Sequence, residues 1–532
     1  MLFSQETVRN DGFKAGRSLF AAGGFIGADA PGGKIHQYMK HKEDLFQLIR
    51  SMSKSEKRYF TLDAQKSGQR PSKYLELFQL INEMEKYSEE KLRKKFGRNL
   101  PYDKSYLYEA ILRSMRDYRS SKSRAARIRE LLLDARYLYE RGLYLQCEER
   151  LRDARQVAES LGDQLALLEI NKEMRNITWD LKRRSFREEV QALIDEKETH
   201  LEAVGEEFKY LDMLYELLLK NIKGTPKAAM EELEKEGYLS LIEERGTPRA
   251  VHARRRYFQC AALLSQMKGD PEAALAHYEK VVDWWEQNEA YRQEEFYRYV
   301  IDLSNFLSFC YTNKKLEYMP PVLSRLENSE PKNFHDQQTI FQNVSTFKLI
   351  YHINLGIAEG VDSLVESIEK GMQKFQINIV TQTVLTFNTA ILLFIVEKFE
   401  ACRYWLLKII KGERFSERKD IKTGAYLLHL IAVYEIDEID LLESTYRSTY
   451  RYVHKELNAP SGSFERAITY GVKRLLDAPP GKKRENMRKL QEKVQAIKQD
   501  PAQRVPLGLD DLALYWINSR LESKSLAKVM NG

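Results

Sequence analysis

The chain has few cysteines for its length. It contains four in 532 residues, far apart and without a Cys-x-x-Cys pair to hold a metal ion or a redox disulfide. Secreted chains usually show paired cysteines, so this pattern favours a reducing, cytoplasmic compartment. Each cysteine lies within a helical pattern and is expected to be a small core residue: Cys147, Cys260, Cys310 and Cys402.

Recognised catalytic and metal-binding motifs are also missing. The nine histidines are scattered, with no His-Glu-x-x-His sequence and no Cys/His cluster at zinc spacing. Adjacent acidic residues such as Glu148 and Glu149 diverge by about 100° on a helix, so they do not converge on one atom. We therefore expect a protein that is not an enzyme and that has no cofactor or metal site. A hydrolase site assembled from distant helices stays the alternative.

Long uncharged runs are rare. The longest extends from Phe375 to Val396, and eight of its positions are Gln, Asn or Thr. Those polar groups would be costly in hydrocarbon, so the run predicts a buried helix and no membrane span.

Glycine and proline are scarce outside a few turns, at 26 and 14 residues, while 31% of the residues are charged. From Glu43 onward apolar residues recur at helical spacing, and no run shows strand-like alternation with hairpin turns. The sequence therefore predicts an all-α protein.

The formal charge of +7 is unevenly distributed. Residues 40–130 carry 23 Lys and Arg against 13 Asp and Glu, and residues 482–504 carry 8 against 3. Two basic ends thus flank a mildly acidic middle.

The first 38 residues form a leader with seven glycines and little periodicity, which predicts disorder. A signal peptide is one alternative, because Arg9, Lys14 and Arg17 precede an apolar patch. A phosphate loop at residues 28–35 is another, although it lacks the first glycine and the Ser or Thr that would hold magnesium. A third is that translation starts at Met39.

Residues 39–125 are expected to form a basic N-terminal helical region. Ser53 and Glu56 form a predicted capping box at the start of its second helix. This opening resembles uncharacterised bacterial helical-repeat proteins, and that resemblance implies no activity. The next helices are expected near Ser72 to Glu85, Ser88 to Phe96, and Lys104 to Arg119.

One stretch, YFQCAALLSQMKGDPEAALAHYEKVV (257–282), predicts a helical hairpin. Two antiparallel helices pack closely only where the residues at the crossing are small, as Ala262 and Ala274 are. Gly269 and Pro271 end the first helix and start the second. The same order recurs upstream at Ala135, Leu138, Gly142, Tyr144, Cys147, Leu151 and Ala154, and downstream at Ala390, Leu393, Phe399, Cys402, Leu406 and Ile409.

These residues resemble the tetratricopeptide repeat (TPR), a helix-turn-helix unit with small residues in both helices and a glycine at the turn. The resemblance implies a right-handed α-solenoid whose concave face binds a peptide or a partner protein. Cys147, Ala274 and Cys402 are 127 and 128 residues apart, which is three units with a period near 42. Further units are then expected near Val190, Met230, Met319, Val361 and Ser444.

A period near 42 also admits HEAT-type repeats, but the Gly-x-Tyr and Gly-Asp-Pro turns favour TPR-like units. The solenoid is expected to cover residues 126–458, followed by a C-terminal helical cap over 459–532. The helices of the cap are expected at Ser463–Leu476, Arg484–Lys498 and Leu509–Leu526, the last burying Leu512, Tyr515, Trp516 and Ile517.

In the family's pattern the first helix of each unit lines the groove. Arg129 and Arg136, with Arg255 and Arg256, would grip an acidic segment or form an ordinary solvated stripe. Around Phe387 the groove set is apolar, and it is either an interface or buried core. Of the pair Trp284-Trp285, one is expected in the core and one at an edge. The candidate partner-binding residues are Arg129, Arg136, Tyr139, Arg256, Gln259, Gln266, Phe387 and Phe394.

The function expected from this resemblance is a non-catalytic scaffold or adaptor that binds a protein or peptide partner. The alternative is nucleic-acid binding by the basic region, because Lys and Arg neutralise phosphates while aromatic rings stack on bases. Against it, no recognised nucleic-acid motif is present, and tyrosines at helical spacing are more often core. The interleaved aromatics are Phe96, Tyr102, Tyr106, Tyr108 and Tyr118, with a smaller set, Tyr446 and Tyr450, beside Arg447 and Arg451.

Overall fold

The computed structural model describes residues 43–65, 73–120, 122–223, 226–235, 237–243, 246–375, 377–412, 418–503 and 505–531. The regular structure in these ranges is helical, and they contain no strand, which confirms the all-α prediction. The predicted leader, residues 1–38, and its alternatives lie outside the described residues.

The described chain divides into two compact units. The N-terminal unit comprises residues 43–306 and 330–337, and the C-terminal unit comprises residues 307–329 and 338–531. The division predicted from the sequence, into a leader (1–38), a basic N-terminal region (39–125), a solenoid (126–458) and a C-terminal cap (459–532), stays a prediction.

Five helices open the N-terminal unit around a small core that includes Leu45, Phe60 and Ile111. The capping box is confirmed: the Ser53 amide donates to Glu56 Oε2 at 2.7 Å, and the Glu56 amide donates to Ser53 Oγ at 3.2 Å. The helices are α3 (Asp44–Ser51), α4 (Lys54–Gln65), α5 (Lys73–Asn82), α6 (Glu89–Phe96) and α7 (Leu100–Ser120).

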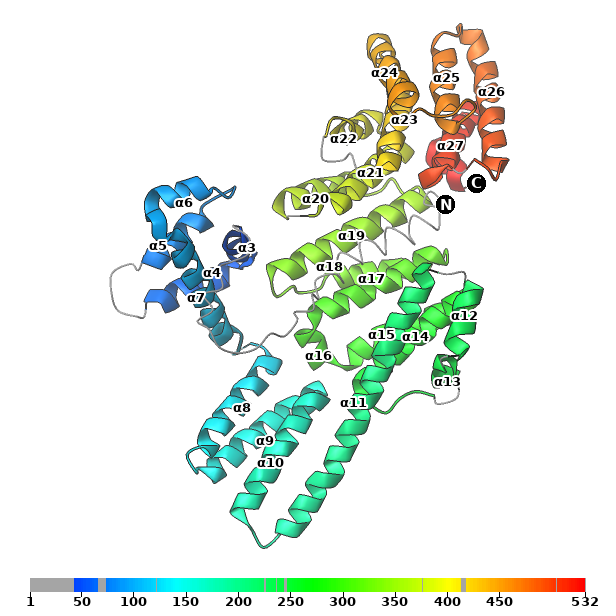
Figure 1. Ribbon diagram of the computed structural model, residues 1–532. Helices are drawn as coiled ribbons and strands as arrows, with labels where there is room; N and C mark the ends of the chain where they lie inside the picture. Colours follow the sequence, from blue (N-terminus) through cyan, green and yellow to red (C-terminus); the bar gives the residue numbers. More distant parts are fainter. Residues whose placement is uncertain are drawn as a thin grey trace. The chain divides into compact units, whose positions relative to one another are not determined.

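The rest of the N-terminal unit contains antiparallel helix pairs joined by tight turns (Figure 1). Gly142, Gly162 and Gly269 adopt left-handed backbone angles at three turns, where a side chain would be strained. At the last of these turns Asp270 Oδ1 accepts the Ala273 amide at 3.0 Å. The helices are α8 (Arg124–Tyr139), α9 (Tyr144–Leu161), α10 (Gln164–Leu181), α11 (Phe186–Lys223), α12 (Pro226–Lys235), α13 (Tyr238–Glu243), α14 (Val251–Lys268), α15 (Pro271–Gln287), α16 (Glu289–Glu294) and α17 (Phe296–Thr312), which continues into the C-terminal unit.

The small residues at the predicted hairpin crossings are buried, as expected: Cys147, Ala274 and Cys402. In the α8–α9 pair the Cys147 thiol donates to the Ala135 carbonyl on the facing helix at 3.0 Å. Only a small side chain at each position permits this approach, because a larger one would separate the two backbones.

A continuous core in the C-terminal unit extends from Leu349 to Leu526. In its last part Leu512, Trp516 and Ile517 are buried as predicted, while Tyr515 is half-buried. The helices are α18 (Met319–Glu327), α19 (Phe334–Leu355), α20 (Val361–Lys374), α21 (Ile379–Ile395), α22 (Phe399–Lys411), α23 (Lys419–Ile436), α24 (Ile439–Arg451), α25 (Phe464–Leu476), α26 (Pro480–Gln499), α27 (Leu509–Glu522) and α28 (Leu526–Asn531).

The predicted final helix was too long. The structure ends α27 at Glu522, because Ser523 adopts a left-handed φ of 53° and breaks the helix before α28 begins. The uncharged run forms α21, which is buried on nearly every side. Within the described part of the chain, none of the helices combines the length and the apolar character needed to cross a membrane.

Candidate ligand groove between α8 and α10

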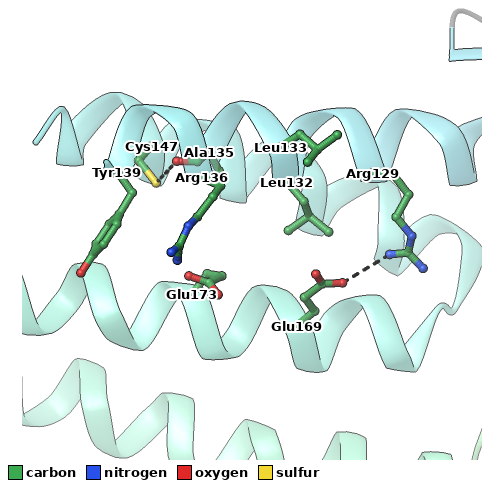
Figure 2. Close-up of a pocket in the computed structure, with 9 residues that line it drawn as sticks. All are labelled: Arg129, Leu132, Leu133, Ala135, Arg136, Tyr139, Cys147, Glu169 and Glu173. Atoms are coloured by element: carbon green, nitrogen blue, oxygen red, sulfur yellow. Dashed lines mark hydrogen bonds and ion pairs between the residues drawn. The ribbon is translucent and has the colours of Figure 1, made fainter. Parts of the chain in front are cut away.

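A groove lies between helices α8 and α10 of the N-terminal unit (Figure 2). Its volume is about 360 Å³, within the range of small-ligand and peptide side-chain pockets. The residues that line it are Arg129, Leu132, Leu133, Ala135, Arg136, Tyr139, Cys147, Glu169 and Glu173.

The start of α8 fixes which of its side chains face the groove. Ser123 is the N-cap, and its Oγ accepts the Ala126 amide at 3.1 Å. From there Arg129, Arg136 and Tyr139 follow at spacings of seven and three, so they lie on one face of the helix. Three of the candidate residues therefore come together here.

Both groove arginines already have acidic partners. Arg129 Nη1 lies 3.6 Å from Glu169 Oε2, and Arg136 Nε lies 3.0 Å from Glu140 Oε1. The two arginine side chains are 55% and 59% exposed. Ion pairs this exposed contribute only about 0–1 kcal/mol each, so a ligand carboxylate can replace the present partner at little cost.

Tyr139 closes one end of the groove. Its hydroxyl donates to Asp180 Oδ2 at 2.8 Å, and this hydrogen bond raises the pKa of Tyr139 above its ordinary value. The ring packs against Tyr144, with the centroids 5.5 Å apart. Tyr139 is thus held at both ends and forms a fixed wall.

The floor of the groove is apolar. Leu132, Ala135 and Cys147 form it, and burial raises the pKa of the Cys147 thiol to about 11. At neutral pH this thiol is protonated and already donates to the Ala135 carbonyl, so it is not an activated nucleophile. The residues that line the groove can therefore make apolar contacts and ion pairs with a ligand.

Glu169 and Glu173 are groove residues that the sequence reasoning missed. They lie one turn apart on α10, and Figure 2 shows Glu173 facing Arg136 across the groove. The sequence does contain a signal for these two residues. They form an i, i+4 acidic pair on α10, the first helix of the hairpin expected near Val190, and they occupy the face equivalent to the groove face of α8.

The candidates on α14 lie mostly inside the protein. The Gln259 side chain is buried and donates to Asp302 Oδ1 at 2.6 Å, while Arg255, also buried, donates to Asp302 Oδ2 at 2.6 Å. Arg256 and Gln266 are half-buried, and burial lowers the pKa of Arg256 to about 10, which leaves it charged at neutral pH. Arg255 and Gln259 therefore have no surface to offer a partner, because α17 and its Asp302 pack against α14.

Both members of the tryptophan pair are buried, so the prediction that one lies at an edge was wrong. Each indole N–H has an internal acceptor: Trp284 donates to the Val251 carbonyl at 2.8 Å, and Trp285 donates to Asp302 Oδ2 at 2.7 Å. These hydrogen bonds let two large polar-tipped rings lie inside the fold.

The apolar set on α21 is core. Phe387 and Phe394 are buried, which is the second of the two alternatives that the sequence left open. Gly424 on α23 makes room for Phe387, since a Cβ there would lie 2.8 Å from the Phe387 ring. A helix without a charged face is expected inside a protein, and α21 carries no charged residue.

The aromatics of the basic N-terminal region divide into two groups. Phe96 is buried, and Tyr108 and Tyr118 are half-buried, with the Tyr118 hydroxyl donating to Ser55 Oγ at 3.1 Å. Tyr102 and Tyr106 are exposed one turn apart on α7.

No group of three or more His, Cys, Asp or Glu side chains is placed to hold a metal ion in the residues that the structure describes. Comparisons of the chain with protein-family models, with curated proteins and with solved structures give no match.

Proposed function

We propose that this protein is a non-catalytic interaction scaffold that binds a segment of a partner protein in the groove between α8 and α10. The observation that carries the proposal is the composition of the groove. Arg129 and Arg136 on one wall face Glu169 and Glu173 on the other, over an apolar floor. Arg129, Arg136 and Glu169 are exposed and only weakly paired, so each wall holds a charge that is available for exchange with a ligand.

The ligand that fits this groove is a peptide with acidic groups along one edge and basic groups along the other. Its carboxylates would take charge-assisted hydrogen bonds from the two arginines, and its cations would meet the two glutamates. An apolar side chain between them would cover Leu132 and Leu133. A purely acidic segment would leave the glutamates facing like charge.

The architecture that we propose is a right-handed α-solenoid of TPR-like hairpins with a period near 42, in the cytoplasm. Support comes from where the first helices of successive hairpins begin, at residues 124, 164, 251, 296, 334, 379 and 419. The glycine turns at Gly142 and Gly269 and the buried small residues agree with TPR-like units. The four cysteines are buried free thiols, as suits a reducing compartment.

Site-directed photo-cross-linking in the native host tests the groove. Leu133, 71% exposed and part of the groove lining, is replaced by p-benzoylphenylalanine, and Ile439, 65% exposed on α24, is replaced in a control. We expect a discrete cross-linked partner from position 133 that disappears when Arg129→Glu and Arg136→Glu are added. Equal products from both positions, or none from position 133, would contradict the proposal.

Nucleic-acid binding is a second candidate because Tyr102 and Tyr106 are exposed on α7, close in sequence to the basic helix α6. Rings placed in this way can stack on bases while Lys and Arg neutralise phosphates. A mobility-shift titration of single-stranded RNA at low salt tests it. Binding that is lost in a Tyr102→Ala, Tyr106→Ala double variant would support it, and no shift at low salt would exclude it.

A further inference from the structure

Helix α11 has apolar side chains in water at a regular interval. It is 38 residues long, and Ile194, Leu201, Phe208 and Tyr215 recur every seventh residue. Their exposed fractions lie between 36% and 51%. Isolated exposed apolar residues are normal on protein surfaces, but a repeat over four heptads on one helix is not explained by chance exposure.

The positions three residues further on complete a heptad pattern. Val204, Leu211 and Leu218 are half-buried beside the exposed residues, and Lys197 occupies the equivalent place in the first heptad. Alternating spacings of three and four are those of a coiled-coil seam. We call the exposed residues at positions 194, 201, 208 and 215 the α11 stripe. With Leu219, one turn beyond, it extends about 38 Å along the helix.

The fold of the N-terminal unit uses a different face of α11. Tyr210, Met213 and Leu217 are buried there, and the Tyr210 ring packs edge-on against Tyr257 of α14 with centroids 5.7 Å apart. The Cys260 thiol of α14 donates to the Tyr210 carbonyl at 3.5 Å. The α11 stripe is therefore not required to attach α11 to α14.

The geometry of the stripe points to a helical occupant. On a straight α-helix, residues seven apart drift by about 20°, so a heptad seam winds slowly around the helix and matches a second helix in a left-handed supercoil. Each exposed side chain can then enter a hole between four residues of the facing helix.

The charges beside the stripe indicate what kind of helix fits. Asp195, Glu198, Glu202 and Asp212 are exposed on its solvent side, with Lys209 among them. Residues that flank a seam meet the flanking residues of the other helix, where opposite charges favour pairing and like charges oppose it.

A second copy of α11 fits poorly on this ground. In an antiparallel pair Glu198 of one copy would face Asp212 of the other, and both side chains are exposed. This arrangement places carboxylates opposite each other, a like-charge contact that selects against the wrong partner. In a parallel pair the flanking residue opposite Asp212 is Glu207, which offers no positive charge to pair with it.

We propose that the α11 stripe is a docking surface for an amphipathic α-helix of a partner protein whose apolar face is flanked by Lys and Arg. This surface is separate from the groove between α8 and α10. The proposal stands whether or not the groove binds a ligand.

Fluorescence anisotropy with synthetic peptides tests the proposal on the full chain. The probe is a labelled 28-residue peptide with Leu at both seam positions of four heptads and Lys at the flanking positions. A matched peptide has Glu in place of each flanking Lys. We expect the Lys-flanked peptide to bind at least about tenfold more tightly than the Glu-flanked peptide, and Leu201→Glu or Phe208→Glu to weaken it by at least about tenfold.

Charge reversal and a distant control sharpen the result. A Glu198→Lys, Glu202→Lys double variant should weaken binding of the Lys-flanked peptide and strengthen that of the Glu-flanked one, whereas Ile439→Glu on α24 should change neither. Circular dichroism checks that each variant keeps its helices. Absence of binding, binding unaffected by Leu201→Glu and Phe208→Glu, or sedimentation that shows a dimer disrupted by Phe208→Glu would each overturn the proposal.

Discussion

Helices α14, α15 and α21 to α23 bury most of the large apolar side chains that they carry, whereas α8, α10 and α11 keep several of theirs in water. We call the first set the closed helices and the second the open helices. On the closed helices even polar groups such as Arg255 and Gln259 are internal. On the open helices Leu133, Trp179 and Phe208 remain exposed.

This difference separates two uses of apolar residues. Burial of a large apolar side chain contributes about 1.5–3 kcal/mol to the stability of the fold. The closed helices gain this stabilisation because their apolar side chains are buried against other parts of the same chain. The open helices leave part of it unused in the folded chain, as the proposed groove and the proposed α11 stripe both require. We therefore expect substitutions on the closed helices to change stability and those on the open helices to change binding.

The largest contrast is expected between two tryptophans. Trp405 on α22 is 2% exposed, and Trp179 on α10 is 61% exposed. Trp405→Ala should lower the free energy of unfolding by about 3–5 kcal/mol, because it removes a buried ring and leaves a cavity. Trp179→Ala should lower it by less than about 0.5 kcal/mol. Urea denaturation followed by circular dichroism measures both, and similar losses would remove the distinction between the two sets of helices.

A second contrast compares a buried carboxylate with an exposed one. Asp302 accepts hydrogen bonds from Arg255, Gln259 and Trp285, all within the fold. Asp302→Ala leaves the Arg255 charge buried without a counter-ion and should cost about 3–5 kcal/mol. Glu140→Ala, which removes only the exposed partner of Arg136, should cost less than about 0.5 kcal/mol. If the denaturation midpoint falls equally in the two variants, the hydrogen bonds of Asp302 do not lie in the core.

A third, smaller contrast lies on one helix. Ala274 on α15 is buried at the crossing with α14, and Ala276, two residues on, is exposed. Ala274→Trp should destabilise the fold by about 1–3 kcal/mol or more through overpacking. Ala276→Trp should leave the melting temperature nearly unchanged. If Ala276→Trp is the more damaging of the two, the crossing has been misplaced.

The smallest expected effect is a pH dependence from Glu207 on α11. Burial and, to a smaller extent, the nearby Asp163 raise the pKa of its carboxyl from 4.5 to about 7, although the positive charge of Arg256 acts to lower it. The folded chain therefore holds this proton more tightly than the unfolded chain. Its contribution to stability is present in full below pH 4.5 and is lost as the pH rises through about 7.

Removal of the Glu207 charge should expose this dependence. Glu207→Gln is expected to raise the melting temperature at pH 8 and to change it little at pH 4, because the native carboxyl is already neutral at the lower pH. Glu202→Gln, at an exposed position on the same helix, serves as the control. A pH profile of melting temperature that is the same in Glu207→Gln as in the native chain would show that Glu207 is well solvated.

Local features of the fold could be predicted from the sequence. The capping box at Ser53, the turn at Gly269 and the burial of Cys147 each depend on residues within one hairpin, so helical periodicity and turn chemistry are sufficient to find them. Helical periodicity likewise predicts that Arg129 and Arg136 lie on one face of α8.

Burial imposed by a third helix could not be predicted in this way. Periodicity shows that Arg255 and Gln259 lie near each other on α14, but not that Asp302, more than forty residues later, covers them. For Phe387 the signal was present, since α21 has no charged residue on any side. In the sequence the heptads of α11 are not distinguishable from ordinary helical periodicity. Only the structure shows that they are exposed and that the other face of the helix is buried.

The accessibility of the α11 stripe in the folded chain tests the central claim most directly. The four native cysteines are buried, and burial raises the pKa values of Cys147, Cys260 and Cys402, so they should react slowly with maleimide. A cysteine introduced by Leu201→Cys on the stripe should be labelled at once, whereas Leu217→Cys on the buried face of the same helix should stay protected. Addition of the Lys-flanked peptide should slow labelling at position 201. If position 201 is as protected as position 217 in the chain alone, the stripe is not an exposed docking surface.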